Sequence, residues 1–352
     1  MTTAAPRVGR LEPGPRDSIA DVAGVTVGHA TLAAGELQTG VTVVLPHALD
    51  PFLHKLPAAA VVINGFGKSV GLMQLNELGV LETPIALTTT LSVGTIVMAE
   101  VRAAIAAHPG LARTTTTVNP LVFECNDGYL NDVQALAVTE AHYREALAAA
   151  TPDFARGAIG AGRGMSCFGL KGGVGTASRT VGSGETRFTL GALVLANFGR
   201  LETLTVAGRA LGPLLAERLA ARERIPAPQR DQGSIIVVLA TDAPLDHRQL
   251  RRVATRAAAG IGRSGSYYGH GSGDIALAFS TAATLPHDPP GPLRDVRVLV
   301  DVALEPLFEA AAEATEQAID DALFSAQTVT GFAGHTRYAL TDLAPDWPEL
   351  LR

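Results

Sequence analysis

The distribution of apolar and polar residues divides the chain into short strands and a few amphipathic helices. Apolar runs bounded by glycine or polar residues predict strands, whereas apolar positions that recur every three or four residues predict helices. The predicted strands cover residues 25–27, 40–45, 59–63, 187–195, 201–206, 234–240, 274–279 and 296–302. The predicted helices cover residues 69–78, 96–107, 133–149, 247–259 and 305–324.

The order of these elements favours a layered α/β architecture, because helices and strands mix without strict β-α-β alternation. Two glycine-dense segments, residues 157–164 and 171–175, are interpreted as tight turns. The first twenty residues are rich in proline and charge and predict an arm or an early turn. No repeat or low-complexity linker interrupts the chain, so we expect one domain over residues 1–352.

Composition narrows the functional classes. With 352 residues, 47% of them hydrophobic, the chain can bury a large core. A net charge of −6 argues against a nucleic-acid partner, which needs a clustered basic surface. Cys125 and Cys167 are too few for a disulfide framework, which suits a reducing compartment. No secretory signal and no apolar run of roughly 20 residues is present, so we expect a cytoplasmic protein without a membrane partner.

The junction between Gly233 and Ser234 carries the strongest chemical signal. A polar, proline-broken stretch, residues 222–232, runs directly into the apolar strand that Ser234 opens. If the bond between the two residues is cut, Ser234 gains a free α-amine beside its own hydroxyl. An α-amine has a pKa of about 8 and can act as the general base for that hydroxyl. The alternative is an ordinary loop that enters a core strand.

Other polar residues fall at predicted strand ends. Ser272 and Asp274 lie two residues apart, so on a strand they share one face and can relay a hydrogen bond. Glu124 could pair with a substrate amine, and Tyr129 could donate a hydrogen bond from its phenol. Asn197 follows a predicted strand, where its amide could donate to an oxyanion. Turn chemistry alone would also explain most of these residues.

A competing nucleophile is Ser69, in the G-x-S-x-G pattern of residues 67–71. Asp242 and His270 follow in the order that a nucleophile elbow requires. A glycine-rich turn between strand and helix explains the same residues. The segment is no P-loop, because Val62 occupies the position of the required glycine. No cluster of His, Cys, Asp and Glu shows ligand spacing, so we expect no metal and no cofactor.

Nine segments together resemble one family, the L-aminopeptidase/D-amidase-esterase and β-aminopeptidase family of self-processing serine hydrolases. The matching segments are 19–29 (IADVAGVTVGH), 40–42 (GVT), 81–85 (LETPI), 127–132 (DGYLND), 160–162 (GAG), 171–176 (KGGVGT), 196–199 (ANFG), 233–244 (GSIIVVLATDAP) and 271–274 (GSGD). They occur through nearly the whole chain, which makes a chance resemblance untenable.

The resemblance implies an α/β fold of four αββα layers, like that of N-terminal-nucleophile hydrolases. It implies a cut between Gly233 and Ser234 into residues 1–233 and 234–352, and assembly of the cut units into a homotetramer. It also implies a serine aminopeptidase or amidase that removes N-terminal residues from short peptides, amides or esters through an acyl-enzyme.

The resemblance also assigns roles by position. Ser234 matches the nucleophile, Ser272 and Asp274 the pair that tunes it, Asn197 the oxyanion donor, Tyr129 an active-site tyrosine, and Glu124 the carboxylate that receives a substrate ammonium. Some members carry glutamate at the position of Asp274, and the shorter aspartate side chain of this chain reaches less far. Two other readings stay open: an esterase that uses Ser69, and a non-catalytic binding protein. A related acyltransferase branch uses threonine as nucleophile, which Ser234 disfavours.

Overall fold

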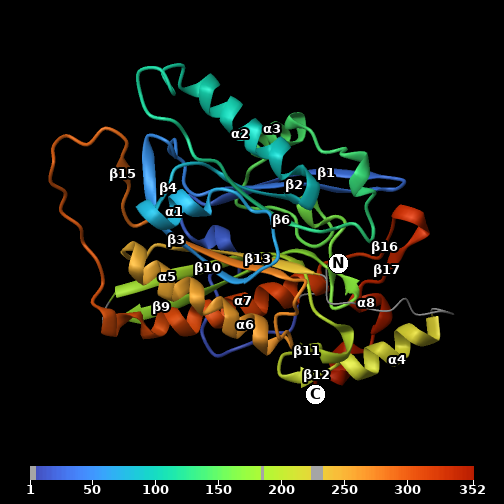
Figure 1. The fold of residues 1–352 in the computed structure, drawn as a ribbon. Helices are drawn as coiled ribbons and strands as arrows, with labels where there is room; N and C mark the ends of the chain where they lie inside the picture. Colours follow the sequence, from blue (N-terminus) through green and yellow to red (C-terminus); the bar gives the residue numbers. More distant parts are fainter. Residues whose placement is uncertain (1–4, 184–185, 223–232) are drawn as a thin grey trace.

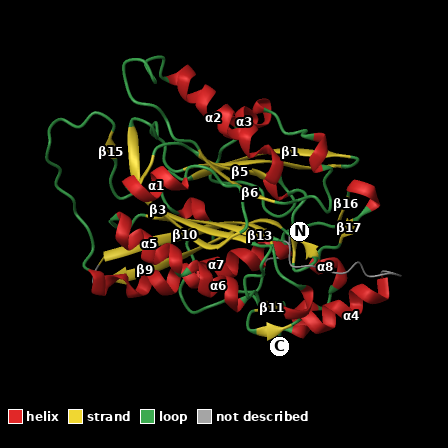
Figure 2. Cartoon of the chain, in the orientation of Figure 1, coloured by secondary structure: helices red, strands yellow, loops and turns green. Residues whose placement is uncertain are grey.

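The computed structural model describes residues 5–183, 186–222 and 233–352, in which two sheets lie face to face between layers of helices (Figures 1 and 2). In these residues the smaller sheet has the strand order β1 (Thr26–Ala34), β2 (Leu37–Leu45), β5 (Ile85–Thr89), β6 (Leu121–Cys125). The larger sheet has the order β15 (Leu285–Pro286), β3 (His54–Gly65), β14 (Gly273–Ser280), β13 (Ser234–Thr241), β10 (Thr186–Asn197), β9 (Gly173–Ser183), with β4 (Val80–Leu81) paired to β3. Short two-stranded hairpins join β7 (Ser166–Cys167) to β8 (Leu170–Lys171), β11 (Thr205–Val206) to β12 (Arg209–Ala210), and β16 (Val329–Thr330) to β17 (Thr336–Arg337).

Helices cover the outer face of each sheet. On the smaller sheet lie α2 (Val93–Ala107) and α3 (Glu140–Ala148), and on the larger sheet lie α5 (His247–Thr255) and α7 (Glu305–Phe324), with α6 (Ala257–Arg263) packed on α7. The remaining helices are α1 (Leu72–Leu78), α4 (Gly212–Arg222), α8 (Leu340–Leu343) and α9 (Trp347–Leu350). The order of layers is therefore helix, sheet, sheet, helix, which confirms the predicted sandwich.

The strand β13 lies at the centre of the core. All eight of its residues are buried, which matches its continuous apolar sequence. Ile236 and Val238 pack between the two sheets, whereas Ile235 and Val237 pack toward the outer helices. A strand that is buried on both faces holds its first residue, Ser234, in a fixed position at the sheet edge.

Several predicted elements are confirmed: β1, β2, β3, β10, β13 and β14 are longer than predicted, and α7 has the predicted bounds. The glycine-dense segment 171–175, predicted as a turn, instead opens the long strand β9. Gly175 lies against α7 so closely that a Cβ there would be 2.0 Å from the carbonyl oxygen of Ala318. Gly175 therefore permits close packing of α7 on the sheet and does not form a turn.

Three other predictions are wrong. Residues 296–302 form no strand, and the backbone N–H of Leu299 bonds to Pro244 while Val300 is exposed. Residues 201–206 form a 3₁₀ turn, Leu201–Thr203, followed by the two-residue strand β11. The helix predicted at 133–149 begins only at Glu140, because Leu136 adopts φ 47° and ends a short 3₁₀ turn.

One helical stretch among the described residues, Thr90–Ala107, is long and apolar enough to cross a membrane by length and composition. Its helix, α2, packs against β5, β6 and α3, and buries Val93, Ile96 and Ala99 there. The same helix carries Glu100, whose carboxylate accepts a hydrogen bond from the N–H of Leu121 at 3.0 Å. These contacts are those of a helix that covers a sheet.

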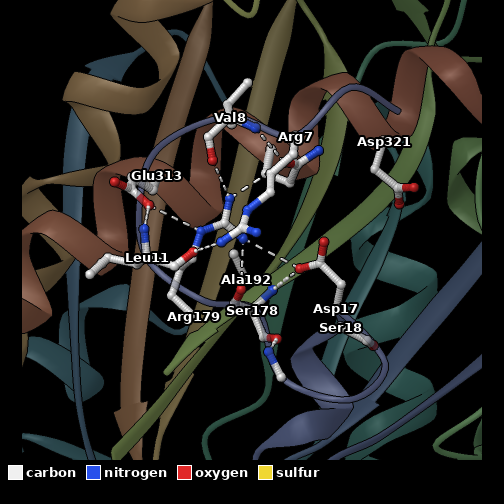
Figure 3. A network of polar contacts seen from close by, with 12 residues as sticks. Arg7, Val8, Leu11, Asp17, Ser18, Ser178, Arg179, Ala192, Glu313 and Asp321 are labelled. Carbon is white, nitrogen blue, oxygen red and sulfur yellow. Dashed lines mark hydrogen bonds and ion pairs between the residues drawn. The ribbon is translucent and has the colours of Figure 1, made fainter. Parts of the chain in front are cut away.

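From residue 5, where the described part of the chain begins, the N-terminal segment forms the predicted arm, and a buried arginine fixes it (Figure 3). The side chain of Arg179, on β9, is fully buried and pairs with Glu313 of α7 at 3.1 Å. Its guanidinium also donates to the carbonyl oxygen of Val8 at 2.8 Å. Glu313 in turn accepts hydrogen bonds from the backbone N–H groups of Arg10 and Leu11. The arm is thus bound by charge to both the sheet and its covering helix.

Candidate active site

The candidate site forms where several strands end at one edge of the larger sheet. Ser234 is the first residue of β13, and it lies opposite Asn197, the last residue of β10. On its other side Ser234 pairs with Gly273, the first residue of β14. Gly273 in turn pairs with Gly65, the last residue of β3. Side chains and backbone groups from four strands therefore converge on Ser234.

Ser234 is buried and touches a backbone donor. The N–H of Gly273 lies 3.2 Å from Ser234 Oγ and 3.3 Å from the carbonyl oxygen of Gly233. A Cβ on Gly273 would be 2.5 Å from the carbonyl oxygen of Phe66 and 3.1 Å from Ser234 Oγ. The glycine therefore permits close approach of the backbone to the serine. One N–H group faces both the candidate nucleophile and the carbonyl that precedes it.

Ser272 and Asp274 form the pair that the sequence predicts. Ser272 Oγ donates to Asp274 Oδ1 at 2.6 Å, and both residues are almost fully buried. The strand register pairs Asp274 with Ile235, one residue beyond Ser234. The pair consequently lies beside the first residues of β13.

Asn197 is held in one amide orientation. Its Oδ1 accepts from the N–H of Ser166 at 2.7 Å, and its Nδ2 donates to the carbonyl oxygen of Asn126 at 3.0 Å. Nδ2 carries a second hydrogen with which it can donate. The amide group is thus fixed on both sides at the position opposite Ser234.

Tyr129 lies further out and reaches the site through a chain of contacts. Its ring stacks on His335, with ring centroids 4.5 Å apart, and the guanidinium of Arg337 lies 3.6 Å from its centroid. Arg337 Nε donates to Ser166 Oγ at 3.1 Å, and Ser166 binds Asn197. The structure therefore connects Tyr129 to the oxyanion candidate indirectly.

Glu124 is buried on β6 and faces the same edge. Its Oε1 accepts from the N–H of Lys68 at 2.9 Å. A Cβ placed on Gly67 would be 3.4 Å from that oxygen and 4.0 Å from the Cα of Gly273. The next residue, Cys125, donates from its thiol to the carbonyl oxygen of Ser234 at 3.4 Å. Glu124 and Ser234 thus border one region.

The electrostatic surroundings support this grouping of carboxylates. Burial raises the pKa of the Cys125 thiol, and the negative charges of Glu124, Asp274 and Asp127 raise it further. Burial also raises the pKa of Asp127 to about 6. Both cysteines are free and buried. Among the described residues no group of His, Cys, Asp and Glu is arranged to hold a metal ion.

The alternative nucleophile Ser69 is not assembled with its predicted carboxylate Asp242, although His270 lies near Phe66 in the same region as Ser69, with ring centroids 6.4 Å apart. Asp242 follows the far end of β13 and accepts from the N–H of Thr189 at 2.7 Å. Ser69 lies in the loop that follows β3, whose last residue is level with the start of β14. The eight residues of β13 separate the two ends by about 25 Å at the usual rise of a strand.

Sequence reasoning missed Gly273, Ser166 and Arg337. Gly273 stands between Ser272 and Asp274, so its place in that motif was a usable signal. Ser166 binds Asn197 through its backbone N–H, which the sequence does not mark, and its hydroxyl accepts from Arg337. Arg337 comes from the C-terminal strand β17, about 140 residues from Asn197 in the sequence (337 − 197), and no local pattern links the two.

The chain is similar to known proteins over most of its length. The model of peptidase family S58 matches residues 17–337. A β-peptidyl aminopeptidase from Sphingosinicella microcystinivorans is 40% identical over 348 residues, covering 92% of this chain and 85% of the relative. A β-aminopeptidase structure from Burkholderia sp. has a TM-score of 0.89 at 39% identity, covering 98% of this chain and 97% of that one.

Two further solved structures are similar over nearly their full lengths. The PH0078 protein of Pyrococcus horikoshii OT3 has a TM-score of 0.91 at 46% identity, covering 98% of this chain and 96% of that one. The L-aminopeptidase D-Ala-esterase/amidase of Ochrobactrum anthropi, described as a variant of the Ntn hydrolase fold, has a TM-score of 0.87 at 35% identity, covering 99% and 98%.

Fold, site and relatives together define a serine aminopeptidase of the N-terminal-nucleophile type. The chain belongs to peptidase family S58.

Proposed function

We propose that the chain cuts itself between Gly233 and Ser234, and that the freed Ser234 is the nucleophile of an aminopeptidase. The observation that carries this proposal is the position of the Gly273 N–H, which bonds to both the Gly233 carbonyl oxygen and Ser234 Oγ. A donor aimed at that oxygen stabilises the negative charge that forms there during attack. The products are residues 1–233 and residues 234–352.

Self-cleavage proceeds by an acyl shift from nitrogen to oxygen. Ser234 Oγ attacks the Gly233 carbonyl carbon, and its proton passes to the Ser234 nitrogen. The C–N bond then breaks and leaves an ester between Gly233 and Ser234. Water hydrolyses this ester, which gives Gly233 a carboxylate and Ser234 a free amine. The hydrogen bond from Gly273 supports the tetrahedral oxyanion in both steps.

Substrate turnover repeats this chemistry with an external carbonyl. The α-amine of Ser234 accepts the proton of its own hydroxyl as Oγ attacks, and then donates it to the leaving amine. Gly273 N–H and Asn197 Nδ2 hold the oxyanion. Water hydrolyses the acyl-enzyme and regenerates Ser234. The Ser272–Asp274 pair, beside the start of β13, tunes the pKa of the amine.

The substrate class follows from Glu124. This buried carboxylate borders the same region as Gly273 and suits the free ammonium group of an N-terminal residue. We therefore propose short peptides, amides and esters with a free amine as substrates. Relatives named β-peptidyl aminopeptidase and β-aminopeptidase support acceptance of β-amino acids at that end. Tyr129 is proposed to line the outer part of this site.

The proposal extends to assembly and location. We propose that the cut units assemble into a homotetramer, as the family resemblance implies, and the exposed apolar side chains of Met73 (89%), Leu293 (93%) and Val302 (87%) are candidates for burial there. Free buried cysteines suit a reducing, cytoplasmic compartment. Light scattering of the purified protein tests the assembly.

The proposal is tested by intact mass and N-terminal sequencing of the wild type and of Ser234→Ala. We expect two wild-type chains, the smaller beginning Ser-Ile-Ile-Val, and one inactive chain for the variant. Ser69→Ala serves as the matched control and should be cut and active. Cleavage or activity of Ser234→Ala would overturn the proposal, and an uncut wild-type chain whose activity is lost in Ser69→Ala would favour the esterase.

A further inference from the structure

We infer that Asn64 is a positioning residue for the oxyanion donor, acting through the peptide between Ser272 and Gly273. This inference rests on the proposed function, because it assigns Asn64 to the same site. Asn64 is the penultimate residue of β3 and half-buried. None of the sequence patterns singled it out.

The side-chain amide of Asn64 donates two hydrogen bonds to the turn that precedes β14. Its Nδ2 donates to the carbonyl oxygen of Gly269 at 2.8 Å and to that of Ser272 at 2.7 Å. The turn itself is closed by the Ser272 N–H, which donates to the Gly269 carbonyl at 2.9 Å. Nδ2 has two hydrogens, and these two carbonyls take both. A single amide thus fixes both ends of a four-residue turn.

The contact with Ser272 is the important one, because the Ser272 carbonyl and the Gly273 N–H belong to one planar peptide. The carbonyl end is held by Asn64 and, at 3.3 Å, by the N–H of Phe66. The N–H end faces Ser234 Oγ and the Gly233 carbonyl oxygen. Fixing one end of a rigid plane fixes the direction of the other. A bonded carbonyl also polarises the peptide, which makes its N–H a better donor.

A β-bulge explains why an asparagine at this position can reach the turn. The register between β14 and β3 pairs Asp274 with Asn64 but Ile275 with Val62. Ile63 is therefore the extra residue of β3. Bulges twist a strand and redirect its side chains, and they occur often beside active sites. Here the bulge lies directly before Asn64, at the edge where the candidate site forms.

Loss of the two hydrogen bonds from Asn64 should slow the chemical step and leave substrate binding unchanged. Removal of a whole oxyanion donor lowers turnover by about 10²–10³-fold. Misalignment of a donor that is still present should cost less, so we expect kcat to fall by about 10- to 100-fold with KM nearly constant. Self-cleavage should slow by a similar factor, because the same N–H contacts Gly233.

The test compares Asn64→Asp and Asn64→Ala with the matched control Asn76→Ala. Asn76 accepts from the N–H of Ala60 at 2.9 Å, so its removal also costs one hydrogen bond to β3 but does not touch the turn. Asn64→Asp keeps the shape and removes both donors. Cleavage rate, kcat and KM are measured, together with inhibition by a peptide aldehyde, which forms a tetrahedral adduct with the nucleophile, and by a ground-state product amine.

The inference predicts that both Asn64 variants lose kcat, cleavage rate and aldehyde affinity together, whereas the product amine binds as in the wild type. Weaker binding of both the aldehyde and the product amine, or full activity in both variants, would overturn the inference. Thermal unfolding identifies a variant that fails to fold, in which case the other variant decides. Activity of Ser234→Ala would overturn the proposed function itself, whereas normal Asn64 variants beside an inactive Ser234→Ala protein would overturn only the role of Asn64.

Discussion

At the scale of single residues, the site depends on backbone groups as much as on side chains. Ser234 and the Gly233 carbonyl share one N–H donor, and that donor comes from a glycine. A side chain on Gly273 would collide with the backbone of Phe66. The same local geometry can therefore serve both the cut and the later turnover, because the oxyanion forms beside the same N–H group in each reaction.

Glu124 provides a test of substrate recognition at this scale. We expect Glu124→Gln to lower kcat/KM for amine-bearing substrates by about 10- to 100-fold, because a charged hydrogen bond contributes about 1.5–3 kcal/mol. The Gln variant keeps an oxygen that can accept from Lys68 N–H, so the fold should be preserved. Steady-state kinetics with two esters, one with a free amine and one with that amine acylated, checks this prediction. Equal losses on both substrates would contradict the role of the ammonium group.

Asp127 predicts a pH dependence of stability. It is buried after β6, where it accepts from Thr89 Oγ1 at 2.6 Å and from Asn131 Nδ2 at 3.1 Å. Burial raises its pKa from 3.8 to about 6 in the folded state. Between these values the folded chain binds more protons than the unfolded chain. The stability from this group is therefore complete below pH about 4 and is lost as the pH rises through about 6.

The size of this effect is about 3 kcal/mol, since each pKa unit corresponds to about 1.4 kcal/mol. We expect Asp127→Asn to remove it, so that the variant gains stability relative to the parent as the pH rises from 4 to 7. Urea unfolding at both values, in the uncut Ser234→Ala background, measures the difference. If the free energies of unfolding of variant and parent differ by the same amount at pH 4 and at pH 7, Asp127 does not titrate in this range.

At the scale of elements, the register between β10 and β13 sets the geometry of the cut. A Cβ on Gly233 would lie 2.1 Å from the carbonyl oxygen of Asn197 and 2.5 Å from the Cα of Phe198. We expect Gly233→Val to displace the peptide before Ser234 and to slow self-cleavage by at least about tenfold. After cleavage Gly233 is a chain end, so the kcat of the cut fraction should be unchanged.

Gly94→Ala is the matched control, because nothing lies within 4 Å of a Cβ at that position on α2. Its cleavage rate should equal that of the wild type. A time course on denaturing gels measures both variants. Wild-type cleavage of Gly233→Val would mean that the close packing against β10 has no part in the cut.

The elements also show what the sequence can and cannot predict. Continuous apolar runs identified β13 and β14, and amphipathic spacing identified α7, because burial leaves those patterns directly in the sequence. The long strand β9 was missed because its first residues are rich in glycine, which usually indicates a turn, whereas Gly175 packs beneath α7 and Gly173 against Gly157. The valines of 296–302 alternate as in a strand, yet Val300 and Val302 are exposed. Such cases depend on the tertiary neighbours, which a local pattern does not contain.

The residues of the candidate site also fall into two groups, those that a sequence pattern indicated and those that it did not. Ser234, Ser272 and Asp274 were found because they stand at the start of apolar strands, and Asn197 because it ends one. The sequence did not identify Asn64, since its function depends on a bulge and on a turn some 200 residues further along. Backbone donors such as Gly273 N–H have no side chain to identify them.

At the scale of the whole molecule, the arm and the larger sheet are joined by buried charge (Figure 3). Arg179 has no exposed side-chain surface, and it binds Glu313 together with the backbone of the arm at Val8. The strand β9 that carries Arg179 pairs with β10, which ends at Asn197. The arm therefore supports the sheet along its edge, and the site forms where β10 ends.

Replacement of Arg179 should release this arm. We expect Arg179→Met to lower the free energy of unfolding by about 3–5 kcal/mol, because it leaves the carboxylate of Glu313 buried without its charged partner. Adding Glu313→Gln should restore part of the loss, since the buried carboxylate is then gone, and Asp17, the other ion-pair partner of Arg179, is 38% exposed to solvent. Arg7→Met, which removes an exposed ion pair with Glu12 and an exposed hydrogen bond to the carbonyl oxygen of Leu11, should cost at most about 1 kcal/mol. Urea unfolding and the rate of tryptic cleavage within the arm measure these effects. A double variant that is no more stable than Arg179→Met would show that lost packing, rather than the buried charge, determines how the arm is held.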